Sequence, residues 1–349
     1  MRKLLFNLHV YLALAAGIFV VILGLTGAIM AFETELDHVL RPHLSYVTPR
    51  DHRLSLVELG DAVAKAFPGE RATGYQVSPF PNISSGAATR RGLVMIDPYT
   101  GEVLGVRPGG MDFLGYVHQL HLRLLIRDKA DTGKTIVSWA GVAMLFLLVS
   151  GLYLWWPLKR FKIAGKTSGR RFWFDLHNAI GILSLLFLIT LTFTGLMIGF
   201  EEHTQPMFYR LTSSQPSQPP KVPPPLAGTT PITPDQAMQI ARDAIPGTFP
   251  FQINVPGPKG AYQIRSRFPE DLTGGGRSRV VVDQYSGAVL FAEGSRTAPG
   301  GARITIANRA IHTGDILGVP SKIAMSLASL LAVVQVFSGA AMWWKRMRN

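Results

Sequence analysis

Four long apolar runs separate segments of mixed polarity along this chain. The runs lie at residues 8–33, 135–156, 172–200 and 320–344, and each carries few charged side chains. About 20 apolar residues suffice for a helix to cross the roughly 30 Å hydrocarbon core of a bilayer. The pattern therefore predicts an integral membrane α-helical protein with four transmembrane helices.

The apolar runs repeat in two halves. The first and third share a His near the start and Thr-Gly near the end, and the second and fourth share Ser-Gly and a later Trp-Trp. The matching residues are His9 and His177, Thr26-Gly27 and Thr194-Gly195, Ser150-Gly151 and Ser338-Gly339, and Trp155-Trp156 and Trp343-Trp344. We expect a tandem duplication with a pseudo-two-fold axis along the membrane normal. A cleaved signal peptide is an alternative for the first run, but its internal copy favours a membrane helix.

The segments between the runs predict two small α+β domains outside the membrane. In each, a capping box opens a helix and a tight turn closes a hairpin. The boxes are Ser55-Leu56-Val57-Glu58 and Thr233-Pro234-Asp235-Gln236, and the turns are Asp97-Pro98-Tyr99-Thr100-Gly101 and Asp283-Gln284-Tyr285-Ser286-Gly287. The first domain occupies 34–134 and includes an amphipathic, His-bearing helix. The second occupies 201–319, with a Pro- and Ser-rich linker first and a His-bearing segment last.

Charge patterning predicts the orientation of the chain in the membrane. The sequence is 16% charged, below the roughly 25% of soluble proteins, and its net charge is +13. Much of the basic excess lies just outside the predicted spans, at Arg2, Lys3, Lys159, Arg160, Lys162, Lys166, Arg170, Arg171, Lys345, Arg346 and Arg348. Because basic residues mark cytoplasmic loops, we expect both termini and the connector 157–171 in the cytoplasm of a bacterial inner membrane. The small domains are then periplasmic, and no nucleic-acid partner is expected.

The chain contains no cysteine. This absence excludes disulfides, iron–sulfur ligation, thiolate zinc sites and covalent haem attachment through a C-x-x-C-H motif. Any haem would therefore be held by histidine alone.

Four histidines occupy matched positions in the two halves. His9 pairs with His177 near the cytoplasmic face, and His121 pairs with His312 near the outer face. A pseudo-two-fold axis would bring each pair together, and two facing imidazoles can hold one haem iron from both sides. His118 precedes His121 by one helical turn, so it is an alternative outer ligand. Interfacial hydrogen-bonding anchors carried along by the duplication are the competing interpretation.

These motifs, with Val117-His118-Gln119-Leu120-His121, make the chain resemble the PepSY-associated transmembrane family over nearly its full length. The family includes inner-membrane ferric-siderophore reductases with four spans and two non-covalent b-type haems. The resemblance implies that His9 and His177 bind the inner haem, and His121 and His312 the outer one. It also implies that the two small domains are PepSY-like.

The resemblance predicts an oxidoreductase that passes electrons across the membrane and reduces Fe(III) in a siderophore or similar chelate on the periplasmic side. No G-x-G-x-x-G follows a predicted strand, so the electron donor is expected to be a quinol or a separate cytoplasmic reductase. Tyr116, Arg123 and Arg309 are candidate contacts for an anionic chelate, although lipid phosphates are equally suitable partners. Asp175 is either a proton acceptor for a quinol or a helix cap, and the cap is favoured.

Two other functions remain open at this stage. One is a haem-free membrane-anchored sensor or peptidase inhibitor, in which the PepSY-like modules bind a protein partner. The other is a metal permease, although no span carries carboxylates at its centre.

Overall fold

The computed structural model describes residues 1–107, 112–157, 169–218, 222–224 and 228–348. Most of the connector 157–171, with Lys159, Arg160, Lys162 and Lys166, therefore lies outside the described residues, as does part of the predicted linker. The chain divides into two compact units. One comprises 1–33, 113–207 and 307–349, and the other comprises 34–112 and 208–306.

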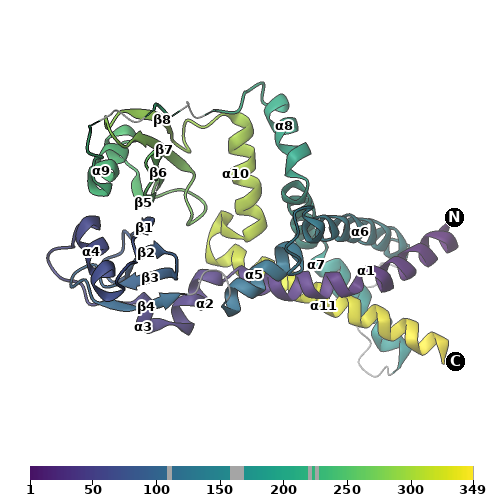
Figure 1. The fold of residues 1–349 in the computed structure, drawn as a ribbon. Coiled ribbons are helices and arrows are strands. Elements are labelled where there is room, and N and C mark those ends of the chain that lie inside the picture. The colour runs from purple at the N-terminus through teal and green to yellow at the C-terminus, as the bar shows by residue number, and fades with distance from the viewer. Residues whose placement is uncertain (108–111, 158–168, 219–221, 225–227, 349) are drawn as a thin grey trace. The chain divides into compact units, whose positions relative to one another are not determined.

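The first unit is a bundle of long helices (Figure 1). In the described part of the chain, four helices are long and apolar enough to cross a membrane: α1 (Arg2–Met30), α6 (Thr132–Trp155), α7 (Arg170–Gly199) and α11 (Val319–Met347). Each packs against two others, in the cyclic order α1, α11, α7, α6. The shorter α5 (Phe113–Arg123) packs against α1 and α6. The chain is therefore a membrane protein with four candidate spans.

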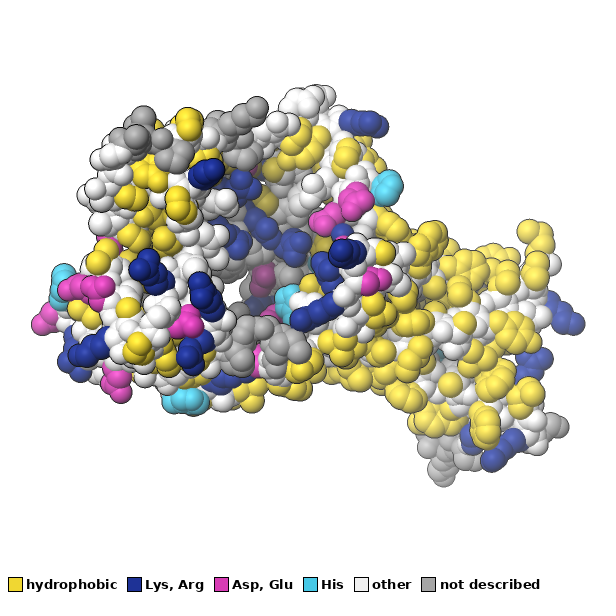
Figure 2. Space-filling model, in the orientation of Figure 1, with side chains coloured by type: hydrophobic (Ala, Val, Ile, Leu, Met, Phe, Trp, Pro, Cys, Tyr) yellow, Lys and Arg dark blue, Asp and Glu magenta, His cyan; other side chains and the backbone are white. Residues whose placement is uncertain are grey.

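The outer surface of this bundle is suited to lipid. Leu183 and Leu186 on α7 are 71% and 72% exposed, and Figure 2 shows a largely hydrophobic surface over the long helices. All four helices begin before their apolar runs, and α11 also ends beyond its run, because flanking basic residues can continue a helix; α1 instead ends at Met30, short of residue 33. The structure thus places α1 from Arg2, ahead of the apolar run that begins at residue 8.

The second unit contains one eight-stranded antiparallel sheet, in the order β4-β3-β2-β1-β5-β6-β7-β8. The strands are β1 (Gly74–Gln76), β2 (Ser85–Thr89), β3 (Gly92–Ile96), β4 (Val103–Arg107), β5 (Phe249–Asn254), β6 (Ala261–Arg267), β7 (Ser278–Asp283) and β8 (Val289–Glu293). The sequence predicted two small domains, whereas β1 and β5 join both sets of strands, with Tyr75 opposite Ile253. Each of these strands would otherwise be an exposed edge, and pairing removes that liability.

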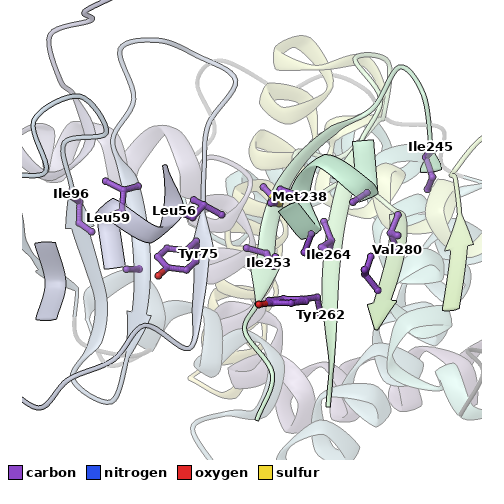
Figure 3. Packing of buried hydrophobic residues seen from close by; sticks show 14 of the residues in the cluster. Leu56, Leu59, Tyr75, Ile96, Met238, Ile245, Ile253, Tyr262, Ile264 and Val280 are labelled. Carbon is purple, nitrogen blue, oxygen red and sulfur yellow. The ribbon is translucent and has the colours of Figure 1, made fainter. Parts of the chain in front are cut away.

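Two helices, α4 (Leu56–Ala66) and α9 (Pro234–Ala244), contribute to the core of this unit. Both begin with the capping boxes that the sequence predicted, in which the Ser55 and Thr233 hydroxyls accept from the backbone N–H three residues on. Figure 3 shows their apolar side chains among those of the central strands. The buried set includes Leu59, Val63, Tyr75, Ile96, Ala237, Met238, Ile253, Tyr262, Ile264 and Val280.

Shorter helices complete the described chain. They are α2 (Glu33–Leu40), α3 (Pro42–Ser45), α8 (Glu201–Leu211), α10 (Gly300–Thr313) and the 3₁₀ turn η1 (Asp315–Leu317). The helical character of α8 and α10 was not apparent from the sequence, because α8 contains Pro206 and α10 begins with two glycines. Both features lower helix propensity.

Asp235 links the two helices of the sheet unit. Its carboxylate accepts the Leu56 N–H at 2.7 Å and the Val57 N–H at 3.1 Å, so a residue of α9 satisfies the first donors of α4. Removing such a capping carboxylate costs about 0.5–2 kcal/mol. We expect Asp235→Ala to increase hydrogen exchange at the α4 amides of the full-length protein. Asp243→Ala, on the same helix, is the control and should leave that exchange unchanged; equal exchange in both variants would contradict the link.

Candidate functional site

Two imidazoles predicted to pair do lie together in the bundle unit. The ring centres of His121 on α5 and His312 on α10 are 6.4 Å apart, with an interplanar angle of 51°. Imidazoles on opposite sides of one metal have ring centres roughly 6 Å apart, because each metal–nitrogen bond is about 2 Å and each nitrogen lies about 1 Å from its ring centre. The observed spacing fits this arrangement.

The hydrogen bonds of this pair fix which ring nitrogen carries the proton. His121 Nδ1 lies 2.9 Å from Thr26 Oγ1, whose own hydroxyl donates to the Ile22 carbonyl. His312 Nδ1 lies 3.1 Å from Thr194 Oγ1 and 3.2 Å from the Leu191 carbonyl. A carbonyl only accepts, so His312 Nδ1 donates to the Leu191 carbonyl. At His121 the Thr26 hydroxyl already donates to the Ile22 carbonyl, which favours donation by Nδ1 there too. Nε2 of each ring is therefore the unprotonated nitrogen.

The second predicted pair lines one cavity. His9 of α1 and His177 of α7 both line one largely apolar hollow that is partly open to the surroundings. Ala13, Gly17 and Gly181 also line it, and the two glycines let Val336 and Gln335 of α11 approach closely.

The His9–His177 pair, called the lower pair below, is hydrogen-bonded in the same way. His9 Nδ1 lies 2.8 Å from Ser150 Oγ, and that hydroxyl donates to the Phe146 carbonyl. His177 Nδ1 lies 2.9 Å from Ser338 Oγ and 3.1 Å from the Gln335 carbonyl. By the same argument, Nδ1 donates in both rings and Nε2 keeps its lone pair.

Each imidazole thus rests in a cradle made of a buried hydroxyl and the glycine that follows it. A Cβ at Gly27 or Gly195 would meet the Cε1 of His121 or His312 at 3.2 and 2.9 Å. A Cβ at Gly151 or Gly339 would meet the Cε1 of His9 or His177 at 3.4 and 3.5 Å. The cradle residues are Thr26-Gly27, Ser150-Gly151, Thr194-Gly195 and Ser338-Gly339.

Sequence reasoning singled out these dipeptides as repeat markers and missed their role. The signal was present, since within the four apolar runs a hydroxyl residue followed by glycine occurs four times, once for each paired His. Which dipeptide serves which His is decided by helix packing, because every cradle belongs to a different helix from its imidazole.

Burial keeps the His121–His312 pair, called the outer pair below, neutral. It lowers the pKa of His121 and of His312, since desolvation disfavours the charged ring. A neutral imidazole with an unprotonated nitrogen is the form that binds a metal.

His118 has a different environment from His121. Its Nδ1 lies 3.0 Å from the Glu33 carboxylate, and the hydrogen bond to Glu33 raises the pKa of His118. Arg309 lies close enough for its charge to act on the same ring. His118 is therefore held by a carboxylate, and the ring facing His312 is His121.

The other predicted contacts are dispersed. Tyr116 is 45% exposed on α5. Arg123 Nη1 forms an ion pair with Asp131 at 2.5 Å, so its charge is already balanced. Arg309 on α10 is the predicted cation that the structure places beside the outer pair.

The favoured cap role of Asp175 is wrong. Helix α7 begins at Arg170 and has no acidic residue in its first turn, so Asp175 lies too far along to meet unbonded N–H groups. Its buried carboxylate accepts instead from Arg171 Nε at 3.0 Å. The apolar pattern misplaced the start of the helix, because Arg170 and Arg171 lie outside the apolar run but inside the helix.

Within the residues described, no group of three or more His, Cys, Asp or Glu side chains is placed to hold a metal ion. The histidines instead form pairs. A pair of imidazoles would be sufficient to hold haem iron, since the macrocycle supplies the rest of its ligands. The donor set and the tautomers therefore fit bis-histidine haem.

The fold and site define a class: a membrane protein with four candidate spans, paired imidazoles between its helices, and an antiparallel sheet unit. The family model for the PepSY-associated TM region matches residues 6–346. The chain belongs to this family. A search of curated proteins found no match.

Proposed function

We propose that this protein is an oxidoreductase that carries electrons across the membrane through two non-covalent b-type haems. His9 and His177 would hold one haem, and His121 and His312 the other. The observation that supports this most is shared by all four rings: Nδ1 donates to a hydroxyl or carbonyl, which leaves Nε2 free to bind a metal.

When bound, each haem would supply a one-electron Fe(III)/Fe(II) couple. The chain's own residues would tune the reduction potential of that couple. The hydroxyls fix the ring orientation and tautomer of each imidazole, and such outer partners tune the ligand's basicity. With two imidazoles holding each haem, the iron would have no position left for O₂, which suits electron transfer.

The cradles also support the tandem duplication. Thr26 and Thr194 occupy matched positions near the ends of α1 and α7, and Ser150 and Ser338 occupy matched positions near the ends of α6 and α11. Equivalent helices thus serve equivalent histidines. We propose that the two halves arose by duplication and that the sheet unit combines two PepSY-like modules.

The proposed location is the bacterial inner membrane, with both termini cytoplasmic and the sheet unit periplasmic. Arg2 and Lys3 precede the apolar part of α1, and Lys345 and Arg346 follow that of α11. Figure 1 shows the two termini at the same end of the helix bundle. The positive-inside rule assigns this end to the cytoplasm.

The substrate we propose is Fe(III) in a siderophore or a similar chelate at the periplasmic face. Reduction weakens the hold of such chelators on iron and so releases it. The donor is a quinol or a separate cytoplasmic reductase. The proposed contacts for this chelate are Arg309, His118 and Tyr116. Arg123 is a less suitable contact, because it already forms an ion pair with Asp131.

The test is reduction of ferric chelates by the protein in sealed vesicles. With a reductant supplied on the cytoplasmic side, the protein should reduce external Fe(III) faster than a haem-depleted control does. Equal rates would contradict the reductase. A preparation that is colourless from haem-replete cells would support a sensor or peptidase inhibitor, and metal uptake without a donor would support a permease.

The two lower cradles offer a matched comparison. Ser150→Ala removes the hydroxyl that His9 Nδ1 contacts, whereas Ser338→Ala leaves His177 the Gln335 carbonyl at 3.1 Å. Loss of such a partner typically costs about 10–100-fold in metal affinity. We expect Ser150→Ala to lower haem retention during dilution by about tenfold more than Ser338→Ala does. Equal retention in the two variants, measured by absorbance, would contradict the assigned contacts.

A further inference from the structure

Three arginines share the face of the sheet opposite α4 and α9. Arg265 and Arg267 lie two apart on β6, and Arg279 on β7 is directly opposite Arg265. Side chains opposite one another in an antiparallel pair point to the same face, and like charges there destabilise the sheet. The neighbouring Tyr262, Ile264 and Val280 point to the buried face, so the arginines point away from the core.

The guanidinium groups are held in place. Arg265 lies 5.7 Å from the Phe251 ring centre and donates from Nη2 to the Gly275 carbonyl at 2.8 Å. Arg279 lies 5.5 Å from the Phe291 ring centre. Both arginines are exposed. Stacked, oriented guanidinium groups lose less freedom when they bind a ligand than flexible side chains do.

Nearby carboxylates do not cancel this charge. Glu293 is opposite Arg279 on β8 and offsets one arginine. Glu270 bonds Arg296, and Asp271 bonds Ser295 and the Phe268 N–H. Among the residues that the structure describes, three arginines against one carboxylate leave this face positive.

Amides continue the same face. Gln252 on β5 is opposite Arg265, and Asn254 is opposite Gln263. Gln76 on β1 is opposite Gln252. These side chains both donate and accept hydrogen bonds, so the arginines border a polar row rather than apolar residues.

We propose that this Arg face, made of Arg265, Arg267 and Arg279 with Gln252 and Gln263, binds an anionic metal chelate that bears carboxylates. Planar guanidinium groups match carboxylates in a two-point fork, and the amides match the remaining polar atoms of a chelator. Lipid headgroups are less suitable, since lipid-binding clusters are flexible Lys/Arg runs beside a membrane helix. The identity of the chelate as a reductase substrate rests on the function proposed above.

The probe is gallium(III) citrate, a polycarboxylate chelate whose metal does not change redox state under these conditions. Its binding to the full-length protein in detergent can be measured by equilibrium dialysis without any electron transfer. Arg265→Gln and Arg279→Gln should each weaken binding by about tenfold, the effect of one lost charge-assisted hydrogen bond. Arg91→Gln is the matched control, since Arg91 also stacks on an aromatic ring, Phe67, and its binding should match the wild type.

Unchanged gallium citrate binding in both Arg265→Gln and Arg279→Gln would overturn the inference, as would equal weakening in Arg91→Gln. Arg-dependent binding to anionic lipid vesicles with no binding of gallium citrate would assign the face to lipid and also overturn it. Arg-dependent gallium binding without ferric citrate reduction would keep the inference and reject the reductase. Circular dichroism of each variant separates lost binding from lost fold.

Discussion

Replacing His312 with alanine is expected to halve the haem content of the purified protein and to abolish ferric reduction. His312 faces His121 at a ring-centre distance of 6.4 Å and supplies one of the two proposed axial ligands of the outer haem. A single remaining imidazole holds haem less tightly and leaves an axial position open. The measurement is haem per chain by absorbance of the pyridine adduct, together with the spectrum of the reduced protein.

The control for this change is His203→Ala, because His203 is exposed on α8 and belongs to no pair. It should retain the full haem content. His312→Ala with undiminished haem and a six-coordinate spectrum would show that another residue ligates the outer iron, and His118 would be the next residue to test.

Replacing Gly195 with alanine is expected to disturb the outer pair although no ligand is removed. The new Cβ would lie 2.9 Å from His312 Cε1, closer than real side chains approach, so the ring must shift. Changes in the residues that support a metal ligand typically cost about 10–100-fold in metal affinity. We expect haem retention at the outer site to fall by at least tenfold on this scale.

Gly339→Ala is the matched change at the lower pair. Its Cβ would lie 3.5 Å from His177 Cε1, an ordinary van der Waals distance, so haem content should be preserved. Equal losses in Gly195→Ala and Gly339→Ala, or no loss in either, would contradict the proposed packing of imidazoles against glycines.

The four candidate membrane helices were predictable because a long apolar run can be recognised from the sequence alone. Four runs predicted four helices, and the capping boxes at Ser55 and Thr233 predicted where α4 and α9 begin. These features depend on residues close together in the sequence. The same local character explains why the helices were too short in the prediction, since flanking basic residues carry no apolar signal.

Features that depend on distant residues were not predictable in the same way. The joining of two strand sets through β1 and β5 depends on Tyr75 meeting Ile253, far along the chain. The cradles likewise depend on which helix packs beside which His. Asp175 was misjudged because its role depends on where α7 starts, which the pattern placed too late. The pairing of His121 with His312 was predictable, because a repeated sequence carries that information.

The most direct measurement is the number and ligation of haems in the wild-type protein purified from haem-replete cells. The proposal predicts two b-type haems per chain, each low-spin with two imidazole ligands in electron paramagnetic resonance and absorption spectra. A colourless protein, or haem retained when His9, His121, His177 and His312 are all replaced, would contradict it.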